Sequence, residues 1–426
     1  MCKRYFGALL LLLVLVGTPQ AAVAQNLQQL FERGRDAQAT GDYTTAENVW
    51  QLAIEVAPEN VAARINLGLA LMSQDRIEEA IAAYRVAIEL DPNSAIAYNN
   101  LGNALKAKGN AKAALAAYEE ATRLDPSFAT AHSNLGVMQR QQGDLAAAIT
   151  SYEQAIALEP DHAIAHNNLG NALSDRGDLE AAVAAYARAL QLEPNAVRYY
   201  NLGLTLAELG RHDEAVRAYQ QAINHQPEYI EAYINLGLTY RAQGDLAAAT
   251  RTYQAALERD RDNPYAYSNL GNALAARGEL DAAITAHRRA VAIAPTAIRH
   301  NNLGSALARA GDLAAARTEF RRALALDSDY RAARQNLEIV EAALQAEVTP
   351  VPPNTVPESE APIPAAVEPA PDTESETDAD PTADSSEDAP DAEAEAADSP
   401  EAEAEPEPEA PARDAEPSNP DAAAVN

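Results

Sequence analysis

Asparagine recurs along this chain at a nearly constant interval, and each recurring copy is followed by Leu and Gly. The tripeptide occurs eight times, beginning at Asn66, Asn100, Asn134, Asn168, Asn201, Asn235, Asn269 and Asn302. A carboxamide both donates and accepts hydrogen bonds, so a regular row of them can pair with the N–H and C=O groups of an extended peptide without reading its sequence. The alternative role is structural: each amide bonds to the adjoining helix and fixes the packing geometry.

Motifs that would carry out catalysis or hold a metal are missing from the sequence. We find no glycine-rich phosphate loop, no nucleophile elbow, and no His pair at i and i+4 with a third ligand. The run Asp-Arg-Asp-Asn at 260–263 resembles the start of a calcium loop, but Pro264 stands where the required Gly should follow. The chain has one cysteine, Cys2. We therefore predict no enzyme activity, no metal site and no cofactor.

The spacing between successive Asn residues is 34 residues, or 33 in two intervals, which defines a repeating unit. We number the unit so that the Gly of the tripeptide is position 8. Position 15 is then Gly in all units except one, where it is Asp75, and positions 20 and 27 are Ala throughout. Position 24 is Trp, Tyr, His or Phe, and position 32 is Pro in most units. Such a constant period indicates one supersecondary unit copied end to end.

Each unit has the pattern of two helices. Apolar residues between the landmarks fall three and four apart, which is one face of an α-helix. Gly at position 15 tolerates the left-handed conformation that ends the first helix, and an Asp after it, at 144, 178, 245 and 312, can cap the second. Pro ends the second helix. The position 24 ring is expected to fill the space between neighbouring units.

The register predicts nine units followed by a capping helix at 331–345. The units are 27–60, 61–94, 95–128, 129–162, 163–195, 196–229, 230–263, 264–296 and 297–330. The copies 163–195 and 264–296 are one residue short, so we expect tighter turns and a slightly irregular pitch there. A single unit cannot bury its apolar surface alone, whereas a stack can.

This pattern of small residues, rings and Pro resembles the tetratricopeptide repeat (TPR) family. The resemblance covers 27–330 and implies an all-α, right-handed solenoid whose first helices line a concave groove. It also implies that the Asn residues face this groove. Unit one departs from the row with Glu32 and Arg33, so we expect the groove to begin at the second unit. The implied peptide-binding residues are the eight Asn given above, Asn336, and the position 9 residues Asn103, Asn171 and Asn272; position 5 adds Asn99, Ser133, Asn167, Ser268 and Asn301. The row is similar to the Asn ladder in the repeats of protein O-linked N-acetylglucosamine transferases, which holds substrate polypeptide.

The N-terminus has the plan of a secretory signal peptide. Lys3 and Arg4 precede an apolar run at 8–16, and Ala22-Val23-Ala24 supplies a small-residue cleavage site before Gln25. The run is short for a bilayer span, which needs about 20 residues, although an uncleaved anchor is the alternative. We therefore expect residues 1–24 to be removed and the protein to be exported to the periplasm, cell envelope or medium, without stable membrane insertion.

The composition changes at residue 346. The segment 346–426 contains 24 Asp and Glu against the single Arg413, and 16 of the chain's 25 prolines. With few apolar side chains to bury, it is predicted to be a disordered acidic tail acting as a spacer or tether. Attraction of a basic partner or of divalent cations is the alternative. The total charge of −31 makes nucleic-acid binding an unexpected function.

The sequence thus favours an exported scaffold that binds extended segments of other proteins. Its partners are proteins or peptides that the sequence does not identify. The alternative is an accessory subunit of a cell-envelope enzyme or of a polysaccharide or cell-wall complex. A glycosyltransferase-associated role fits less well, because a disordered segment follows the repeats in place of the expected catalytic domain.

Overall fold

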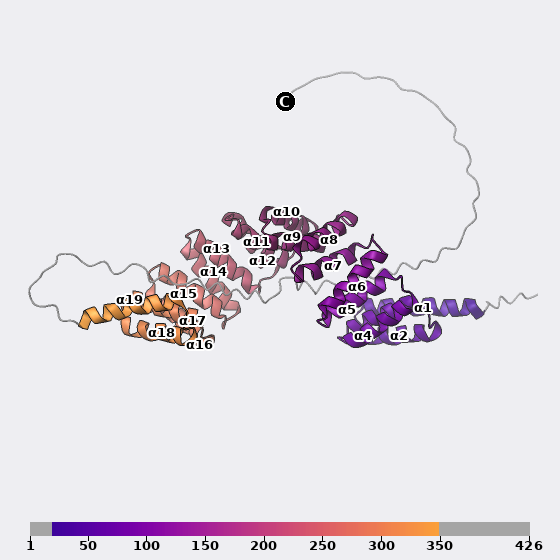
Figure 1. Ribbon diagram of the computed structural model, residues 1–426, viewed down its shortest axis with the longest axis horizontal. Helices are drawn as coiled ribbons and strands as arrows, with labels where there is room; N and C mark the ends of the chain where they lie inside the picture. Colours follow the sequence, from indigo (N-terminus) through magenta and orange to yellow (C-terminus); the bar gives the residue numbers. More distant parts are fainter. Residues whose placement is uncertain (1–18, 349–426) are drawn as a thin grey trace, which may run out of the picture. The chain divides into compact units, whose positions relative to one another are not determined.

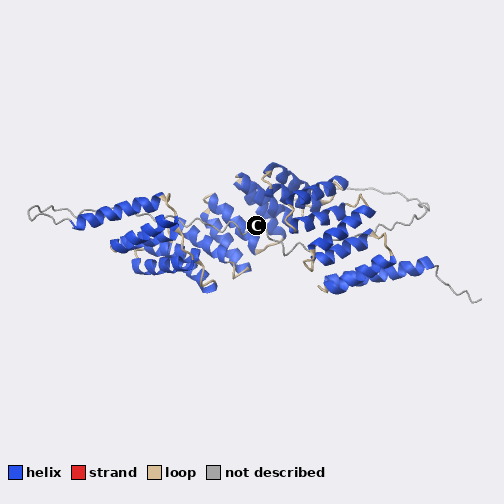
Figure 2. Cartoon of the chain, turned by 60° about the horizontal axis from the view of Figure 1, so that its bottom comes forward, coloured by secondary structure: helices blue, strands red, loops and turns tan. Residues whose placement is uncertain are grey.

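The computed structural model describes residues 19–348, which form 19 α-helices and no strand (Figures 1 and 2). The predicted apolar run at 8–16 and the acidic tail beyond Val348 lie outside these residues. The first helices of the units are α1(Pro19–Ala39), α3(Val61–Met72), α5(Ala95–Ala107), α7(Ala129–Gln141), α9(Ala163–Arg176), α11(Ala196–Glu208), α13(Ile230–Ala242), α15(Pro264–Ala276) and α17(Ala297–Arg309). The second helices are α2(Tyr43–Val56), α4(Ile77–Leu90), α6(Ala111–Leu124), α8(Leu145–Leu158), α10(Leu179–Leu192), α12(His212–His225), α14(Leu246–Arg259), α16(Leu280–Ile293) and α18(Leu313–Leu326). The chain of helices ends in α19(Arg331–Val348).

Each helix packs on the one before it and the one after it, which is the arrangement of a solenoid. First helices of neighbouring units also contact each other, as α7 does with α9 and α15 with α17, and α17 contacts α19. The second helices have no comparable contacts with one another in the described part of the chain. The first helices are therefore drawn closer together than the second helices. A polar residue on the inner side of a first helix consequently lies near its counterpart in the next unit.

The close crossing inside each pair depends on the Gly at position 8. A methyl group placed on Gly170 would lie 2.6 Å from the ring of Tyr186, and the same slot recurs in every unit. The ring at position 24 therefore packs against the Gly of its own unit. The same ring also belongs to a core cluster with residues of the following unit, as Tyr152 does with Ala172 and Tyr253 does with Leu270. The ring therefore fills space between units, as expected, and in addition fills the slot of its own Gly.

The glycines at position 15 end the first helices as the sequence predicts. They have φ angles between +73° and +87°, and Asp75 adopts the same left-handed region with φ +58°. The carboxylates of Asp144, Asp245 and Asp312 accept hydrogen bonds from the third backbone amide of the helix that follows. Asp178 makes no such cap and pairs with Arg176 instead.

The two short units are followed by arginines that the sequence analysis did not assign a role. Position 3 is Ala in most units, but Arg198 and Arg299 occupy it after the copies that lack a residue. Both arginines are buried, and their Nη1 atoms donate to the carbonyls of Glu193 and Ala294, at 2.6 and 3.2 Å. Glu193 and Ala294 are the C-cap residues of the preceding second helices, α10 and α16. A guanidinium thus bonds to the C-cap carbonyl of the helix before each of the two connections that lack a residue.

Both ends of the described region extend beyond the predicted boundaries. The helix α1 begins at Pro19, ahead of the predicted cleavage site before Gln25, and α19 continues to Val348 instead of ending at residue 345. Within residues 19–348, no helix is both long and apolar enough to cross a lipid bilayer.

Candidate functional site

The predicted site residues all lie on first helices or on α19, and together we call them the amide face. Four are partly exposed, namely Asn103, Asn134, Asn168 and Asn235. The others are buried: Asn66, Asn100, Asn171, Asn201, Asn269, Asn272, Asn302 and Asn336. Because buried polar groups need hydrogen-bond partners, the partner of each amide indicates whether it serves packing or is left for a ligand.

Several position 6 amides bond to position 5 of the preceding unit. Asn134 donates to Asn99 Oδ1 at 3.0 Å, and Asn336 donates to Asn301 Oδ1 at 2.9 Å. Asn201 donates to the amide oxygens of unit five, at 3.3 and 3.5 Å, and Asn235 to the Tyr200 hydroxyl at 3.0 Å. These bonds join first helices of successive units. For these residues the packing role is observed.

The residue at position 5 explains which amides lack that bond. For Asn66 and Asn269, position 5 of the preceding unit is Phe31 and Ile234, respectively. The side chains of Phe and Ile cannot accept a hydrogen bond. Each of the two amides donates instead to a carbonyl of its own helix, at 2.9 and 3.1 Å. Asn302 follows Ser268, whose short side chain does not bond to it. The amide face therefore divides into amides that join units and amides that do not.

Position 9 amides depend on the ring at position 24 of the same unit. The hydroxyl of Tyr118 donates to Asn103 Oδ1 at 2.6 Å, and that of Tyr186 donates to Asn171 Oδ1 at 2.7 Å. In unit eight the ring is His287, which has no hydroxyl. Neither polar atom of Asn272 has a partner among the described residues, although only 4% of this residue is exposed.

Unpartnered polar atoms gather on the inner sides of α15 and α17. We name this group the unit 8–9 patch; it consists of Ser268, Asn269, Asn272, Asn301 and Asn302. Its unpartnered oxygens belong to Ser268, Asn269, Asn272 and Asn302. Its unpartnered amide nitrogens belong to Asn272, Asn301 and Asn302. Leaving a buried polar group without a partner costs about 1–3 kcal/mol. Exchanging the oxygen and nitrogen of Asn272 or Asn302 would not help, because both atoms are unpartnered in each.

The patch is electrically neutral. None of its five residues is ionisable, and burial lowers the pKa of the adjoining His287 to about 4, so that this ring is uncharged at neutral pH. The patch consequently matches a ligand that offers neutral donors and acceptors. A ligand with a charge at this place would lose its hydration without gaining an opposite charge.

The histidines at position 4 have structural partners. His132 and His166 lie with Nε2 3.1 and 3.0 Å from the carbonyls of Pro126 and Pro160. His300 differs from the expected aromatic packing, because its Nδ1 lies 2.7 Å from the carboxylate of Glu319. His300 and Arg322 lower the pKa of Glu319, although burial opposes them.

No group of three or more metal-binding side chains exists in residues 19–348. Of the sequence that resembles a calcium loop, Asp260 accepts from the backbone amide of Asp262 at 3.1 Å, and Asp262 pairs with Arg289 at 2.9 Å. These contacts are those of a turn between units.

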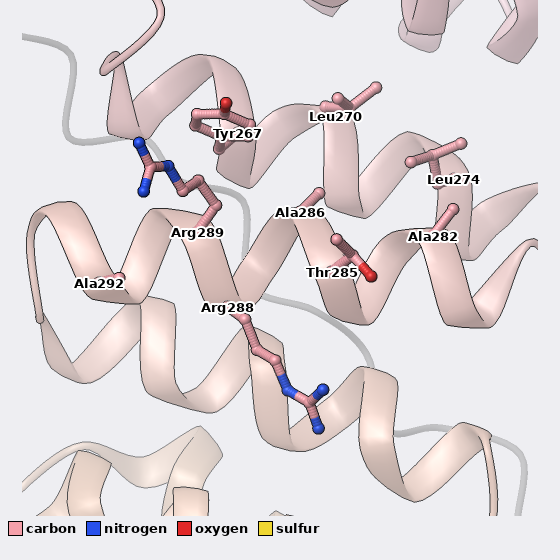
Figure 3. Close-up of a pocket in the computed structure, with 9 residues that line it drawn as sticks. All are labelled: Tyr267, Leu270, Leu274, Ala282, Thr285, Ala286, Arg288, Arg289 and Ala292. Atoms are coloured by element: carbon pink, nitrogen blue, oxygen red, sulfur yellow. The ribbon is translucent and has the colours of Figure 1, made fainter.

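A shallow cavity of about 620 Å³ lies against α15 and α16 (Figure 3). Its lining is Tyr267, Leu270, Leu274, Ala282, Thr285, Ala286, Arg288, Arg289 and Ala292. The α15 members stand at positions 4, 7 and 11, whereas the patch residues of that helix stand at positions 5, 6 and 9. The cavity is therefore separate from the amide face.

The importance of His287 was not recognised from the sequence. The sequence contained the relevant signal, because unit eight has His287 in place of Tyr at position 24 while its position 9 is Asn272. The unequal roles of the position 6 amides were also missed, although the alternation of Asn, Ser, Tyr and aliphatic residues at position 5 encodes them.

Comparison with known protein families identifies the repeats. Models of the TPR repeat match residues 68–109, 102–141, 138–175 and 203–244, and models of the tetratricopeptide repeat match 163–195, 234–298 and 297–330. No curated protein matches the chain.

Among solved structures, MamA is 31% identical and matches 38% of this chain and 95% of its own, with a TM-score of 0.37. YrrB, a TPR protein with an unusual peptide-binding site, is 28% identical over 43% of this chain and 95% of its own, with a TM-score of 0.37. A tetratricopeptide repeat protein from Parabacteroides merdae is 18% identical over 58% of this chain and 99% of its own, with a TM-score of 0.45. On the repeat models and the observed register, this chain belongs to the tetratricopeptide repeat family.

Proposed function

We propose that this protein is a scaffold that binds extended segments of other proteins along its amide face, with the unit 8–9 patch as the main anchoring point. Members of the family bind proteins or peptides, and their fold is typically non-catalytic. The observation that carries the proposal is the gathering of buried, unpartnered amides on α15 and α17. An extended backbone supplies donors and acceptors at regular intervals, so it could satisfy these groups without a particular side-chain sequence.

Selection on a peptide array tests this function with the full-length protein. Peptides that bind wild type are then measured against the double variant N272A/N302A. Two net hydrogen bonds of about 0.7 kcal/mol each correspond to roughly a tenfold loss of affinity. The matched control is N66A, because Asn66 is buried on the same face but donates to its own helix. Equal binding by the double variant and by wild type would contradict the proposal.

We further propose that the protein acts outside the cytoplasm. The charged start, the apolar run and the small-residue cleavage site carry this part of the proposal. Fractionation of expressing cells and N-terminal sequencing of the exported form test it. The expected N-terminus is Gln25. Recovery of the protein only from the cytoplasm would contradict export.

A further inference from the structure

We propose that Arg241, on the inner side of unit seven, binds the carboxylate of an Asp or Glu side chain in the segment that occupies the amide face. The inference rests on the proposed function and deepens it, because it adds one required side chain to a segment whose backbone the unit 8–9 patch holds. The ligand is thus an extended peptide with an acidic residue beside a neutral stretch.

The chain contains a filled version of this site at the junction of units four and five. Arg140 stands at position 12 of unit four, on α7, and its Nε donates to Asp175 Oδ2 at 2.6 Å. Asp175 stands at position 13 of the next unit, on α9. Only 18% of the Arg140 side chain is exposed, so the ion pair is partly shielded from water. An arginine held in this way at position 12 therefore takes a carboxylate as its partner.

The junction of units seven and eight has the same arginine without the acid. Arg241 stands at position 12 of α13, no other unit besides four and seven has Arg at this position, and α13 contacts α15 as α7 contacts α9. Position 13 of unit eight is Ala276, which cannot pair with a guanidinium. Within residues 19–348, the side chain of Arg241 has no ion pair and no hydrogen bond. Because Arg241 is partly exposed, its charge is accessible to a ligand.

The surroundings of the two arginines also match. Tyr152 and Tyr253 occupy position 24 of units four and seven, and position 9 is aliphatic in both units, as Val137 and Leu238. Burial raises the pKa of both tyrosine hydroxyls, whereas the arginine of the same unit lowers it, so each guanidinium lies near its ring. The hydroxyl of Tyr253 is buried and has no partner among the described residues. It is a second donor near Arg241, and the two oxygens of one carboxylate can accept from both groups.

The empty site adjoins the unit 8–9 patch. Asn272 precedes Ala276 by four residues on α15, so the two lie on the same face of that helix with their Cβ atoms about 5–6 Å apart. An extended chain advances about 3.3 Å per residue. An acidic residue within about three residues of the backbone that occupies the patch therefore reaches Arg241. The charge stays outside the patch, which keeps its neutral ligand.

Binding of array-selected peptides to the full-length protein tests the role of Arg241. Each peptide is made with a free and with an amidated C-terminus, and its Asp or Glu is replaced by Asn or Gln. We expect this replacement to weaken binding roughly tenfold, because a charge-assisted hydrogen bond is lost. R241Q should weaken binding of the acidic peptide by a similar factor and have little further effect on its Asn or Gln form. Dependence on the C-terminal carboxylate alone, or equal binding of the acidic and neutral forms, would overturn the inference.

Filling the site from within gives a test that removes no folding contact. A276D places a carboxylate at the position that Asp175 occupies in unit five, next to Arg241. The matched control is A276N, which has the same shape but no charge, and position 276 is exposed. We expect A276D to bind the acidic peptide roughly tenfold more weakly than A276N does. Equal affinity of the two variants for this peptide would contradict a carboxylate site at this junction.

The same measurements separate this inference from the proposed function. If R241Q and A276D both bind the acidic peptide as wild type does, while N272A/N302A still weakens binding, the carboxylate site is refuted and the proposed function stands. If no array peptide binds wild type, both are refuted.

Discussion

Replacing His287 by Tyr tests the account of unit eight. The ring lies against Gly271 in the slot that Tyr occupies in most other units, so a tyrosine is expected to fit without repacking. Its hydroxyl would meet Asn272, as that of Tyr186 meets Asn171 at 2.7 Å. One net hydrogen bond contributes about 1 kcal/mol. We therefore expect H287Y to be more stable than wild type by about this amount at pH 7.

The pH dependence of stability separates the hydroxyl from the histidine itself. Burial lowers the pKa of His287 from 6.5 to about 4, so the unfolded chain binds a proton between these values and the folded protein does not. The stability contributed by neutral His287 is complete above the unfolded pKa and is lost as pH falls toward the folded pKa. The loss is about 1.4 kcal/mol per pH unit within the window, or about 2 kcal/mol at pH 5.

Urea unfolding followed by circular dichroism, at pH 7 and pH 5, measures both effects. Hydrogen exchange in α15 and α16 locates the change, because repeat proteins unfold in segments. The control is H287F, which removes the titrating ring without adding a hydroxyl, as Phe320 does in unit nine. Both variants should lose about 2 kcal/mol less than wild type at pH 5. Equal pH dependence in wild type and both variants would refute a buried neutral His287.

Four further substitutions test the packing. N134A should destabilise the protein by about 1 kcal/mol in urea because its bond to unit three is lost, whereas N168A, at a partly exposed position with no such bond, should change stability little. G170A should cost about 1–3 kcal/mol because its methyl group meets Tyr186 at 2.6 Å, and unchanged stability would contradict this crossing. R198A should destabilise unit six by about 2 kcal/mol in urea, because a buried charge-assisted hydrogen bond is lost. A loss of stability that disappears at high salt would show that Arg198 acts as a surface charge and that its bond to Glu193 is not structural.

The helix pairs were predictable because the residues that define them act locally. A left-handed residue at position 15 and a Pro at position 32 end helices through their own backbone preferences. Ala at positions 20 and 27 and the apolar spacing determine which faces pack. The place of the position 24 ring between units was predicted, but its close contact with the Gly of its own unit was not, since a sequence pattern gives the size of a space but not every helix that borders it.

The division of the amide face was harder to predict, because it depends on residues about one unit apart in the chain. Asn134 is committed to packing by Asn99, whereas Asn302 remains unpartnered because position 5 of the previous unit is Ser268. A repeat pattern treats these two Asn residues as equivalent. Only their contacts distinguish the amide that joins units from the amide left for a ligand.

Backbone N-methylation of an array-selected peptide tests the central claim most directly. Each N–H of the peptide is methylated in turn, and binding to full-length wild type and to N272A/N302A is measured by calorimetry. We predict that at least one methylation weakens binding to wild type by roughly tenfold and has little further effect on the double variant, because both changes remove the same hydrogen bonds. Tolerance of methylation at every position, together with binding that depends only on peptide side chains, would contradict recognition of the backbone by these amides.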